Sequence, residues 1–378
     1  MIHAPLPLSI AVLVLLSISI LYTAFALTRL LTFRFPRIDE NGAPPSISIL
    51  KPLCGLEPDL EQNLTSFCKQ DYPYYNVVFT ARDPADPALG IAENVRVANP
   101  QTQIVVASGG GAPASNPKIE NLEAAMPFAR GDIIVISDSD MRADSQYLRG
   151  IAAQFEDPRV GAATALFTAR STGTLVTRLG TLLVNDQFIP SVLVATAFEP
   201  LTYCFGATAA VRREALARIG GLEALGPYLA DDYMLGRAVS KLGYRVAFAG
   251  TVPQTLVSES TFAQLWAREV RWARTIRTVR PLGYAGSVVT YVLPFALLFL
   301  LLTPNLTAGI ALFLLAAVLR AAVHVVAYRR LQVPGKTGIW LVPLREFLSV
   351  AVWAAGFFGG KASWRYQQLR VRSGGSLK

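Results

Sequence analysis

Two clusters of polar side chains in this sequence have the types and spacing needed for group transfer from a nucleotide-sugar. The first is the pair Asp231 and Asp232, and the second is an Arg-x-x-Arg-Trp cluster formed by Arg268, Arg271 and Trp272. Such a transfer needs a base for the acceptor hydroxyl and positive charge for the departing pyrophosphate. We expect Asp232 to be the base. The two arginines can clamp the diphosphate with their planar forks, and the Trp272 ring can stack on a sugar or a base.

A structural interpretation of the same residues stays open. Asp231 could cap a helix whose apolar stripe would be Leu235, Ala238, Val239 and Leu242. Arginines beside an apolar segment also commonly mark the edge of a membrane. The two clusters together, with further acids upstream, favour the catalytic interpretation.

Three short apolar runs upstream predict strands of an α/β sheet. They are residues 46–53, 75–80 and 132–137. Ligand-binding residues of open α/β sheets lie just past the carboxyl ends of strands. Asp83 follows the second strand, so we expect it to accept hydrogen bonds from a uracil or a ribose. The alternative is a turn former within Asp-Pro-Ala-Asp-Pro.

The third predicted strand leads directly into Asp138 and Asp140. Two carboxylates with this spacing on a tight turn can ligate a hard divalent cation that also binds a diphosphate, which predicts Mg²⁺ or Mn²⁺ as the cofactor. We expect Asp138 to contact the nucleotide-sugar as well. An isolated Asp-x-Asp is more often a solvated turn, and its position after an apolar strand favours the metal. Lys118 is a candidate phosphate or ribose contact, with an ordinary surface lysine as the alternative.

The series Asp83, Asp138-x-Asp140, Asp232 and Arg268-x-x-Arg271-Trp272 resembles the signature of processive-type family 2 and ceramide-glucosyltransferase-type family 21 glycosyltransferases. The resemblance covers most of the chain, through Leu50-Lys-Pro-Leu-Cys-Gly55, Gln70-Asp-Tyr-Pro73, Asn116-Pro-Lys118, Asn121-Leu122, Ser363-Trp364-Arg365 and Gly374-Gly375. It implies an α/β fold, namely the Rossmann-like nucleotide-diphospho-sugar transferase (GT-A) domain, with added transmembrane and interfacial helices.

Within that group the chain looks most like bacterial hopanoid-biosynthesis glycosyltransferases, which implies transfer of N-acetylglucosamine to bacteriohopanetetrol. The segments that carry this likeness are Asp83-Pro-Ala-Asp-Pro-Ala88, Ile189-Pro-Ser-Val-Leu-Val194, Leu229-Ala-Asp-Asp-Tyr233 and Arg271-Trp-Ala-Arg-Thr-Ile276. Animal ceramide glucosyltransferases carry a histidine before a proline where this chain has Ile189, and a glycine where it has Asp140. Both differences count against a strict ceramide assignment.

The composition is that of a membrane protein. With 52% hydrophobic and 16% charged residues, the chain of 378 residues is too apolar for an ordinary soluble protein, and its mean hydropathy is +0.38. Residues 6–28 form an uncharged run that exceeds the roughly 20 residues needed to span a bilayer. A signal peptide is the alternative, but the run lacks a basic n-region and is too long. Because Arg29, Arg34 and Arg37 follow it, we expect the amino terminus outside and residues 29–283 in the cytoplasm.

Residues 284–303 and 306–327 predict a transmembrane hairpin, with Arg329 and Arg330 back on the cytoplasmic side. Arg320 lies within the second run and is expected to face protein or to snorkel. A further polar-punctuated stretch, 181–203, favours interfacial helices over a span, with an ordinary core helix as the alternative. Its polar residues are Asn185, Asp186, Pro190 and Glu199.

The last apolar stretch, 338–360, favours a re-entrant or interfacial helix over a span. Pro343, Arg345 and Glu346 interrupt it, and a crossing would place a basic tail outside, against the positive-inside rule. The basic residues of that tail are Lys361, Arg365, Arg370, Arg372 and Lys378.

The remaining counts exclude some classes. Three cysteines without CxxC spacing and two histidines argue against a zinc site. The net charge of +9 suits an anionic membrane surface and a diphosphate donor, and without a nucleic-acid motif we expect no nucleic-acid partner.

We therefore predict a multi-pass protein of the bacterial inner membrane that binds a UDP-sugar and a lipid acceptor. Its expected parts are an anchor (1–28), a cytoplasmic GT-A domain (29–255), an interfacial region with the arginine cluster (256–283), a hairpin (284–327), and a re-entrant or interfacial helix with a cytoplasmic tail (328–378). The expected reaction is sugar transfer to a hydroxylated lipid with inversion. The main alternative is a ceramide glucosyltransferase using UDP-glucose. A processive polysaccharide synthase would need more membrane helices, and a scaffold would not need every acid and arginine.

Overall fold

The structure, a computed structural model, describes residues 6–36, 44–111, 114–334, 338–359, 361–364 and 367–370. The chain divides into two compact units. The unit called here the helical unit comprises residues 1–33, 168–199 and 257–374, and the sheet unit comprises 34–167, 200–256 and 375–378. Of the sequence features named above, those outside the described residues are Arg37, Arg365, Arg372, Gly374, Gly375 and Lys378.

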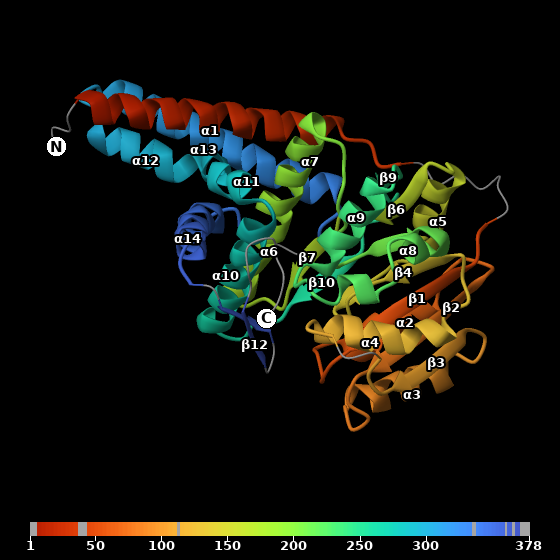
Figure 1. The fold of residues 1–378 in the computed structure, drawn as a ribbon. Coiled ribbons are helices and arrows are strands. Elements are labelled where there is room, and N and C mark those ends of the chain that lie inside the picture. Colours follow the sequence, from red (N-terminus) through yellow and green to blue (C-terminus); the bar gives the residue numbers. More distant parts are fainter. Residues whose placement is uncertain are drawn as a thin grey trace. The chain divides into compact units, whose positions relative to one another are not determined.

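The sheet unit is built on seven strands in the order β3-β2-β1-β4-β8-β6-β9 (Figure 1). The first four are parallel, β8 is antiparallel to both of its neighbours, and β9 is parallel to β6. The strands are β1 (Ile47–Leu53), β2 (Tyr75–Ala81), β3 (Gln103–Ser108), β4 (Ile133–Ile136), β6 (Val160–Thr164), β8 (Ala209–Arg212) and β9 (Arg245–Phe248). The three strands predicted from the sequence, now β1, β2 and β4, are confirmed.

Both faces of this sheet are covered by helices, which explains why its central strands are continuously apolar. Successive side chains alternate between the faces, so Ile49 packs in one hydrophobic cluster and Leu50 in the other. The first face is covered by α2 (Leu60–Cys68), α3 (Ala88–Ala98) and α5 (Tyr147–Ala152), and the second by α4 (Pro117–Ala125), α8 (Arg213–Arg218) and α9 (Asp231–Lys241). The α/β fold class is therefore the one predicted.

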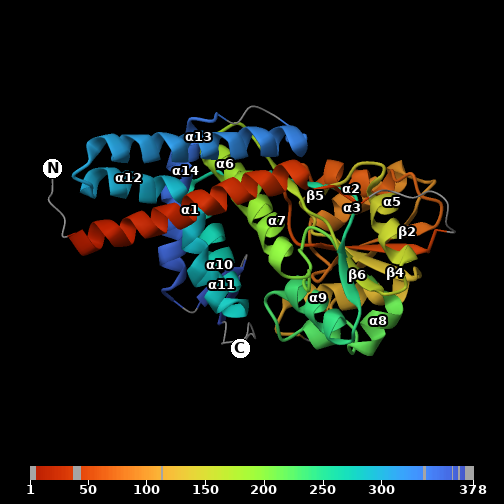
Figure 2. The same ribbon diagram turned by 90° about the horizontal axis from the view of Figure 1, so that it is seen from above.

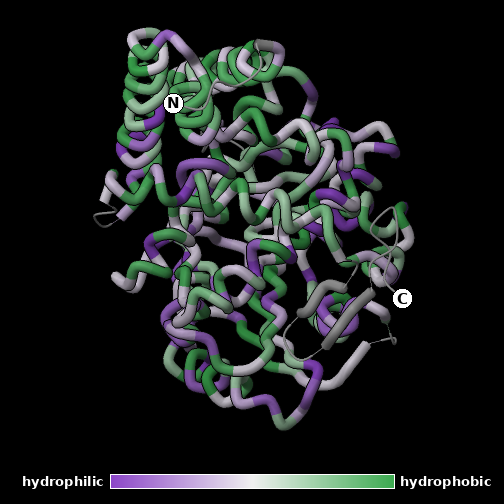
Figure 3. The backbone as a smooth tube through the Cα atoms, turned by 90° about the vertical axis from the view of Figure 1, so that its left-hand side faces the viewer, coloured by the Kyte–Doolittle hydropathy of each residue, from purple (hydrophilic) through white to green (hydrophobic). Residues whose placement is uncertain are grey.

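Within the helical unit, three apolar helices pack side by side (Figures 1 and 2). They are α1 (Leu6–Thr32), α12 (Val292–Leu302) and α13 (Leu306–Arg330). The tube coloured by hydropathy is largely hydrophobic along the helix that starts near the amino terminus (Figure 3). Among the described residues, three helices are long and apolar enough to cross a membrane, namely Pro7–Thr32, Leu175–Phe198 and Leu306–Arg330.

The first arm of the predicted hairpin, 284–303, is not a single helix. Residues Pro281–Thr290 and Val292–Leu302 are bent by 60° at a break between them. Pro294 explains the break, because its ring would clash with the carbonyl of Thr290 in a continuous helix. The freed amide of Leu293 donates to a Glu346 oxygen at 2.7 Å, so the broken backbone is satisfied by protein.

The stretch 181–203, predicted to form interfacial or core helices, is helical up to Phe198. Helices α6 (Leu175–Leu182) and α7 (Ile189–Phe198) are joined by a π-helical segment, η3 (Leu183–Phe188), into one apolar run whose length and composition suit a span. Two of the polar residues that argued against crossing have partners inside the unit. Asn185 exchanges two hydrogen bonds with the Ala169 backbone, and Asp186 lies 2.7 Å from a His324 ring nitrogen.

Helix α14 (Leu341–Gly356) occupies most of the stretch predicted to be re-entrant or interfacial. It has 16 residues, about 24 Å at 1.5 Å per residue, which is shorter than a typical hydrocarbon core. Its two charged residues, Arg345 and Glu346, are fully buried. Its placement in a membrane stays a prediction.

Candidate functional site

Lys118 brings two of the predicted acids of the sheet unit together. Its ammonium lies 2.7 Å from Asp138 Oδ1 and 3.3 Å from Asp231 Oδ2. Asn116 caps helix α4 by accepting from the Lys118 amide, and its own amide nitrogen donates to Asp231 Oδ1 at 3.3 Å. The alternative of an ordinary surface lysine is therefore wrong. Burial by itself would lower the pKa of Lys118, but the surrounding carboxylates raise it above its usual value, so the lysine stays charged.

Asp138 and Asp232 converge on Gly206. A β-carbon at residue 206 would lie 2.8 Å from Asp138 Oδ2 and 3.4 Å from Asp232 Oδ2. Any side chain there would push against the first carboxylate, so glycine leaves both acids access to the same space. No motif in the sequence had marked Gly206 as part of the site.

Asp232 lies in the first turn of α9, and its pKa is raised. Burial, followed by repulsion from Asp231, raises its pKa to about 7, while Lys118 opposes the shift. Asp231 does not cap the helix, because the capping position is Ala230 and no side-chain bond closes that end. Asp231 instead accepts a hydrogen bond from the Asn116 amide and pairs with Lys118.

Asp140 belongs to a second acidic group beside the first. Its Oδ2 accepts from the Thr255 hydroxyl at 2.9 Å, and neighbouring Ser139 donates to Glu57 at 2.7 Å. Burial and then repulsion from Asp138 and Glu57 raise the pKa of Asp140 to about 6. Negative charge is therefore concentrated in this turn.

A divalent cation is compatible with these residues. Among the described residues, no group of three or more His, Cys, Asp or Glu side chains could by itself hold a metal. Mg²⁺, however, is usually bound through one or two carboxylates, with phosphates of the substrate and water completing the shell. Asp138 and Asp140 supply that number, and the mutual repulsion of the acids is what a cation would relieve.

Lys51, on β1, hydrogen-bonds the backbone of the turn that carries Asp138 and was not recognised from the sequence as a site residue. Its ammonium donates to the Asp138 carbonyl at 2.5 Å and lies 3.7 Å from the centre of the Phe67 ring. The side chain is fully buried, and burial lowers its pKa to about 7. Its place within the Leu50-Lys-Pro-Leu segment was the only available signal.

Asp83 follows β2 and is exposed, as expected for a residue past a strand end. Its Oδ1 accepts from the Ala85 amide at 2.9 Å, so the predicted turn-forming role is present. A contact with a nucleotide stays a prediction.

The arginine cluster lies in the helical unit, on α10 (Phe262–Val279). The guanidinium of Arg268 is 5.0 Å from the centre of the Trp272 ring and pairs with Glu259 at 2.7 Å. Its Nε and Nη2 are buried and make no hydrogen bond with any described residue. Arg271 and Trp272 are half-buried on the same helix. Because the cluster and the carboxylates belong to different units, their association in one site stays a prediction.

Residues 11–377 match the profile of a known family, described as glycosyl transferase family 21. The chain belongs to glycosyl transferase family 21. Ceramide glucosyltransferase 1 of Caenorhabditis elegans is 24% identical to this family 21 chain over 241 residues, which are 63% of this chain and 51% of that protein. Ceramide glucosyltransferase of Komagataella phaffii is 28% identical over 115 residues, 29% of this chain and 23% of that protein. The chain thus spans about half the length of the nematode relative it matches.

Among solved structures, this family 21 protein resembles a mannosyltransferase from Pyrobaculum calidifontis in complex with GDP-mannose and Mn²⁺. The two share 19% sequence identity, with a TM-score of 0.57 over 93% of this chain and 98% of the other. At this identity the likeness shows the fold. The fold is the GT-A glycosyltransferase fold that the sequence predicted.

Proposed function

We propose that this protein is a glycosyltransferase that moves a sugar from a UDP-sugar to a hydroxyl group of a lipid, with inversion at the anomeric carbon. The observation that carries the proposal is Asp232, a carboxylate whose pKa is about 7 and which converges with Asp138 on Gly206. The family membership and the GT-A fold support sugar transfer.

In the proposed step, the acceptor oxygen attacks the anomeric carbon opposite the leaving diphosphate. The acceptor proton passes to an oxygen of Asp232, and the bond between the sugar and UDP breaks. A base is most effective when its pKa lies near the working pH, which is the condition met by Asp232. Lys118 keeps its charge and partly offsets the negative charge of Asp138 and Asp231, which lowers the repulsion that an anionic donor meets.

The other proposed donor contacts follow from their side-chain chemistry. Asp138 and Asp140 would hold the divalent cation, which when bound would neutralise the diphosphate. Asp83 would accept hydrogen bonds from the uridine. Arg268 and Arg271 would bind the phosphates, and Trp272 would stack on a sugar or a base. The unpartnered Nε and Nη2 of Arg268 support this role, because a planar fork with free donors suits an anionic oxygen.

We propose a hopanoid polyol as the acceptor and N-acetylglucosamine as the sugar. Ile189, which replaces the histidine of animal ceramide enzymes, has an apolar side chain and is fully buried, so this position offers no polar group to an acceptor. Asp140, which stands where those enzymes have a glycine, supports the same choice. The names of the curated relatives favour the second candidate, a ceramide glucosyltransferase that uses UDP-glucose.

We also propose that the protein is inserted in a bacterial membrane with its amino terminus outside and the carboxylates in the cytoplasm. Its proposed parts are the anchor (1–28), the GT-A domain (29–255), the interfacial region (256–283), the hairpin (284–327) and the last helix with its tail (328–378). The apolar helices α1 and α13 support this proposal. Arg29, Arg329 and Arg330 end these two helices on the side proposed to be cytoplasmic.

Two experiments test the function. Membranes containing the protein are supplied with labelled UDP-sugars, and label is expected in lipid; label in polymer would indicate a polysaccharide synthase, and no label would contradict the enzyme. The purified protein is then offered bacteriohopanetetrol and ceramide in competition, with UDP-N-acetylglucosamine or UDP-glucose. N-acetylglucosaminyl hopanoid is the expected product. Dominant glucosylceramide would overturn the hopanoid proposal in favour of the second candidate.

A further inference from the structure

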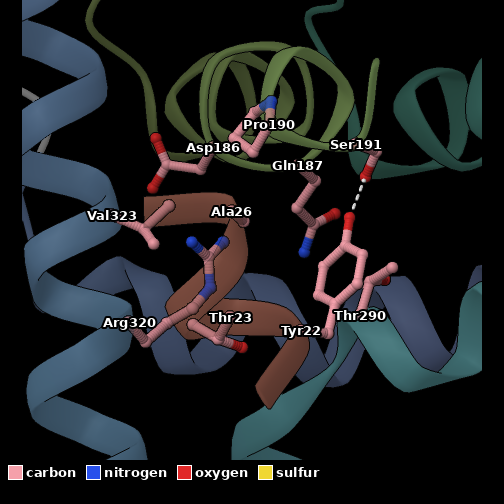
Figure 4. Close-up of a pocket in the computed structure, with 10 residues that line it drawn as sticks. All are labelled: Tyr22, Thr23, Ala26, Asp186, Gln187, Pro190, Ser191, Thr290, Arg320 and Val323. Atoms are coloured by element: carbon pink, nitrogen blue, oxygen red, sulfur yellow. Dashed lines mark hydrogen bonds between the residues drawn. The ribbon is translucent and has the colours of Figure 1, made fainter. Parts of the chain in front are cut away.

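A small cavity lined partly by polar residues lies in the helical unit, bounded by α1, by the junction of η3 with α7, by η5 (Ser287–Thr290) and by α13 (Figure 4). Its volume is about 20 Å³. Since one water needs roughly 10–15 Å³ of such volume, the cavity has room for one hydroxyl-sized group and not for a sugar ring or a phosphate.

Three buried polar atoms of residues that line this cavity have no hydrogen-bond partner among the described residues. They are Asp186 Oδ1, Gln187 Nε2 and Arg320 Nη2. The three residues are only 2%, 9% and 3% exposed, so bulk water does not satisfy these atoms. In Figure 4 the guanidinium of Arg320 and the amide nitrogen of Gln187 point into the same space. Unpartnered buried atoms are costly, and three at one cavity indicate an occupant.

The unpartnered atoms match a hydroxyl group. The carboxylate oxygen of Asp186 needs a donor, while the nitrogens of Gln187 and Arg320 need acceptors. A hydroxyl oxygen has two lone pairs that accept and one proton to donate, so a single group can serve the two nitrogens and still donate its proton to an acceptor. Charge also favours a neutral occupant, because the Arg320 guanidinium already pairs with the Glu346 carboxylate.

The lining and the depth of the cavity suit a lipid hydroxyl. Tyr22, Ser191 and Thr290 line it and are half-buried, and each carries a hydroxyl, with Tyr22 donating to Ser191 at 2.9 Å. Tyr22 lies seven residues before Arg29 on α1, about 10 Å along the helix axis. In the proposed orientation this is the level where lipid hydroxyls meet the hydrocarbon of the cytoplasmic leaflet.

We propose that this cavity is a subsite for one free hydroxyl group of a polyhydroxylated lipid, separate from the hydroxyl that receives the sugar. The subsite rests on the proposed function in one respect, because the bound lipid is taken to be the acceptor. Binding at the subsite requires no transfer, so it can be measured without a UDP-sugar.

The test fills the cavity without removing a charge. Thr23 lines the cavity and Thr28 is exposed on the same helix, and the hydroxyl of each donates to the carbonyl four residues earlier. Thr23→Leu and Thr28→Leu therefore lose the same local bond, but only the first occupies the cavity. Equilibrium binding of bacteriohopanetetrol, ceramide and hydroxyl-free phosphatidylcholine to the purified full chain in detergent is measured for wild type and both variants.

We expect Thr23→Leu to weaken binding of the hydroxylated lipids about tenfold or more, because hydrogen bonds to charged groups are lost. Thr28→Leu should keep wild-type affinity, and phosphatidylcholine should bind all three proteins alike. Unchanged binding of hydroxylated lipids by Thr23→Leu would overturn the subsite and leave the cavity to water. Equal affinity of the wild type for hydroxylated and hydroxyl-free lipids would overturn it as well.

A second filling variant, Ala26→Leu, guards against misfolding of the first. Ala26 also lines the cavity, one helical turn from Thr23. Thermal unfolding shows which of the two filling variants is folded, and lipid binding by the folded variant tests the subsite. The proposed function and the subsite can fail separately. If Thr23→Leu weakens lipid binding but no sugar is transferred, the proposed enzyme activity is contradicted. If sugar is transferred and a folded filling variant binds the acceptor as the wild type does, the subsite is contradicted.

Discussion

The two units both bury acidic and basic side chains, but they pair them differently. In the helical unit, Glu269 and Arg345 are each 0% exposed and share two hydrogen bonds of 2.8 Å. In the sheet unit, the charge of Lys118 acts on three acids, and negative charge remains in excess. Those three acids are Asp138, Asp231 and Asp232.

This difference separates structural from reactive charge. A buried ion pair with matched partners has no reason to change its protonation, and its removal mainly harms folding. Acids that outnumber their partners have perturbed pKa values and can take a proton or a cation, which is common at functional sites. We therefore expect substitutions in the sheet unit to change the rate and substitutions of the Glu269–Arg345 pair to change stability.

The largest effect is expected from Asp232→Asn. Loss of a general base costs about 10²- to 10⁴-fold in rate, and UDP binding should stay close to that of the wild type. Steady-state transfer and UDP titration measure the two quantities. The melting temperature should not fall, because the variant removes repulsion from Asp231. Near-normal turnover would break the assignment and point to Asp231 as the base.

Glu269→Gln should have the opposite profile. It leaves the Arg345 guanidinium buried without a counter-charge, which costs about 3–5 kcal/mol of folding stability. Thermal unfolding in detergent measures the loss. The matched control is Glu93→Gln, which breaks an exposed pair with Arg96 and should leave the melting temperature unchanged. Equal stability of the two variants would show that the buried pair is not structural.

Removal of divalent cations should abolish most of the transfer activity, and either Mg²⁺ or Mn²⁺ should restore it. The reason is the excess negative charge around Asp138 and Asp140, which a cation would neutralise together with the diphosphate. Activity is measured in chelator and after each metal is added back. Full activity in chelator would mean that these acids bind something else.

The smallest expected effect is a shift in pH dependence. Asp232 must be ionised to act as a base, so kcat/KM should rise with pH and level off above about pH 7. Lys118→Met removes a charge that lowers the pKa of Asp232, so the rising limb should move to higher pH. Asp231→Asn removes a charge that raises it, so the limb should move to lower pH. Shifts of the same sign in both variants would contradict this electrostatic account.

Local patterns predicted much of the sheet unit. Strands β1, β2 and β4 were foreseen because apolar runs bounded by turn residues are local signals. Asp138, Asp140 and Asp232 were foreseen as site candidates because of their positions at a strand end and a helix start. The bend before α12 was not predicted, because a long apolar run was taken for one helix. Pro294 is a local signal for this bend.

By itself, the sequence determined three strands of the sheet, the apolar helices α1 and α13, and the acids that lie at a strand end and a helix start, since these follow from the side-chain period and from turn chemistry. Only the tertiary structure decided which charges meet. Lys118 and Asp231 are distant along the chain, as are Glu269 and Arg345, and no local pattern pairs them. The role of Gly206 and the buried state of Lys51 likewise depend on neighbours brought by the fold. The physical reason is that burial and electrostatic pairing act between residues that are close in space, wherever they lie in the sequence.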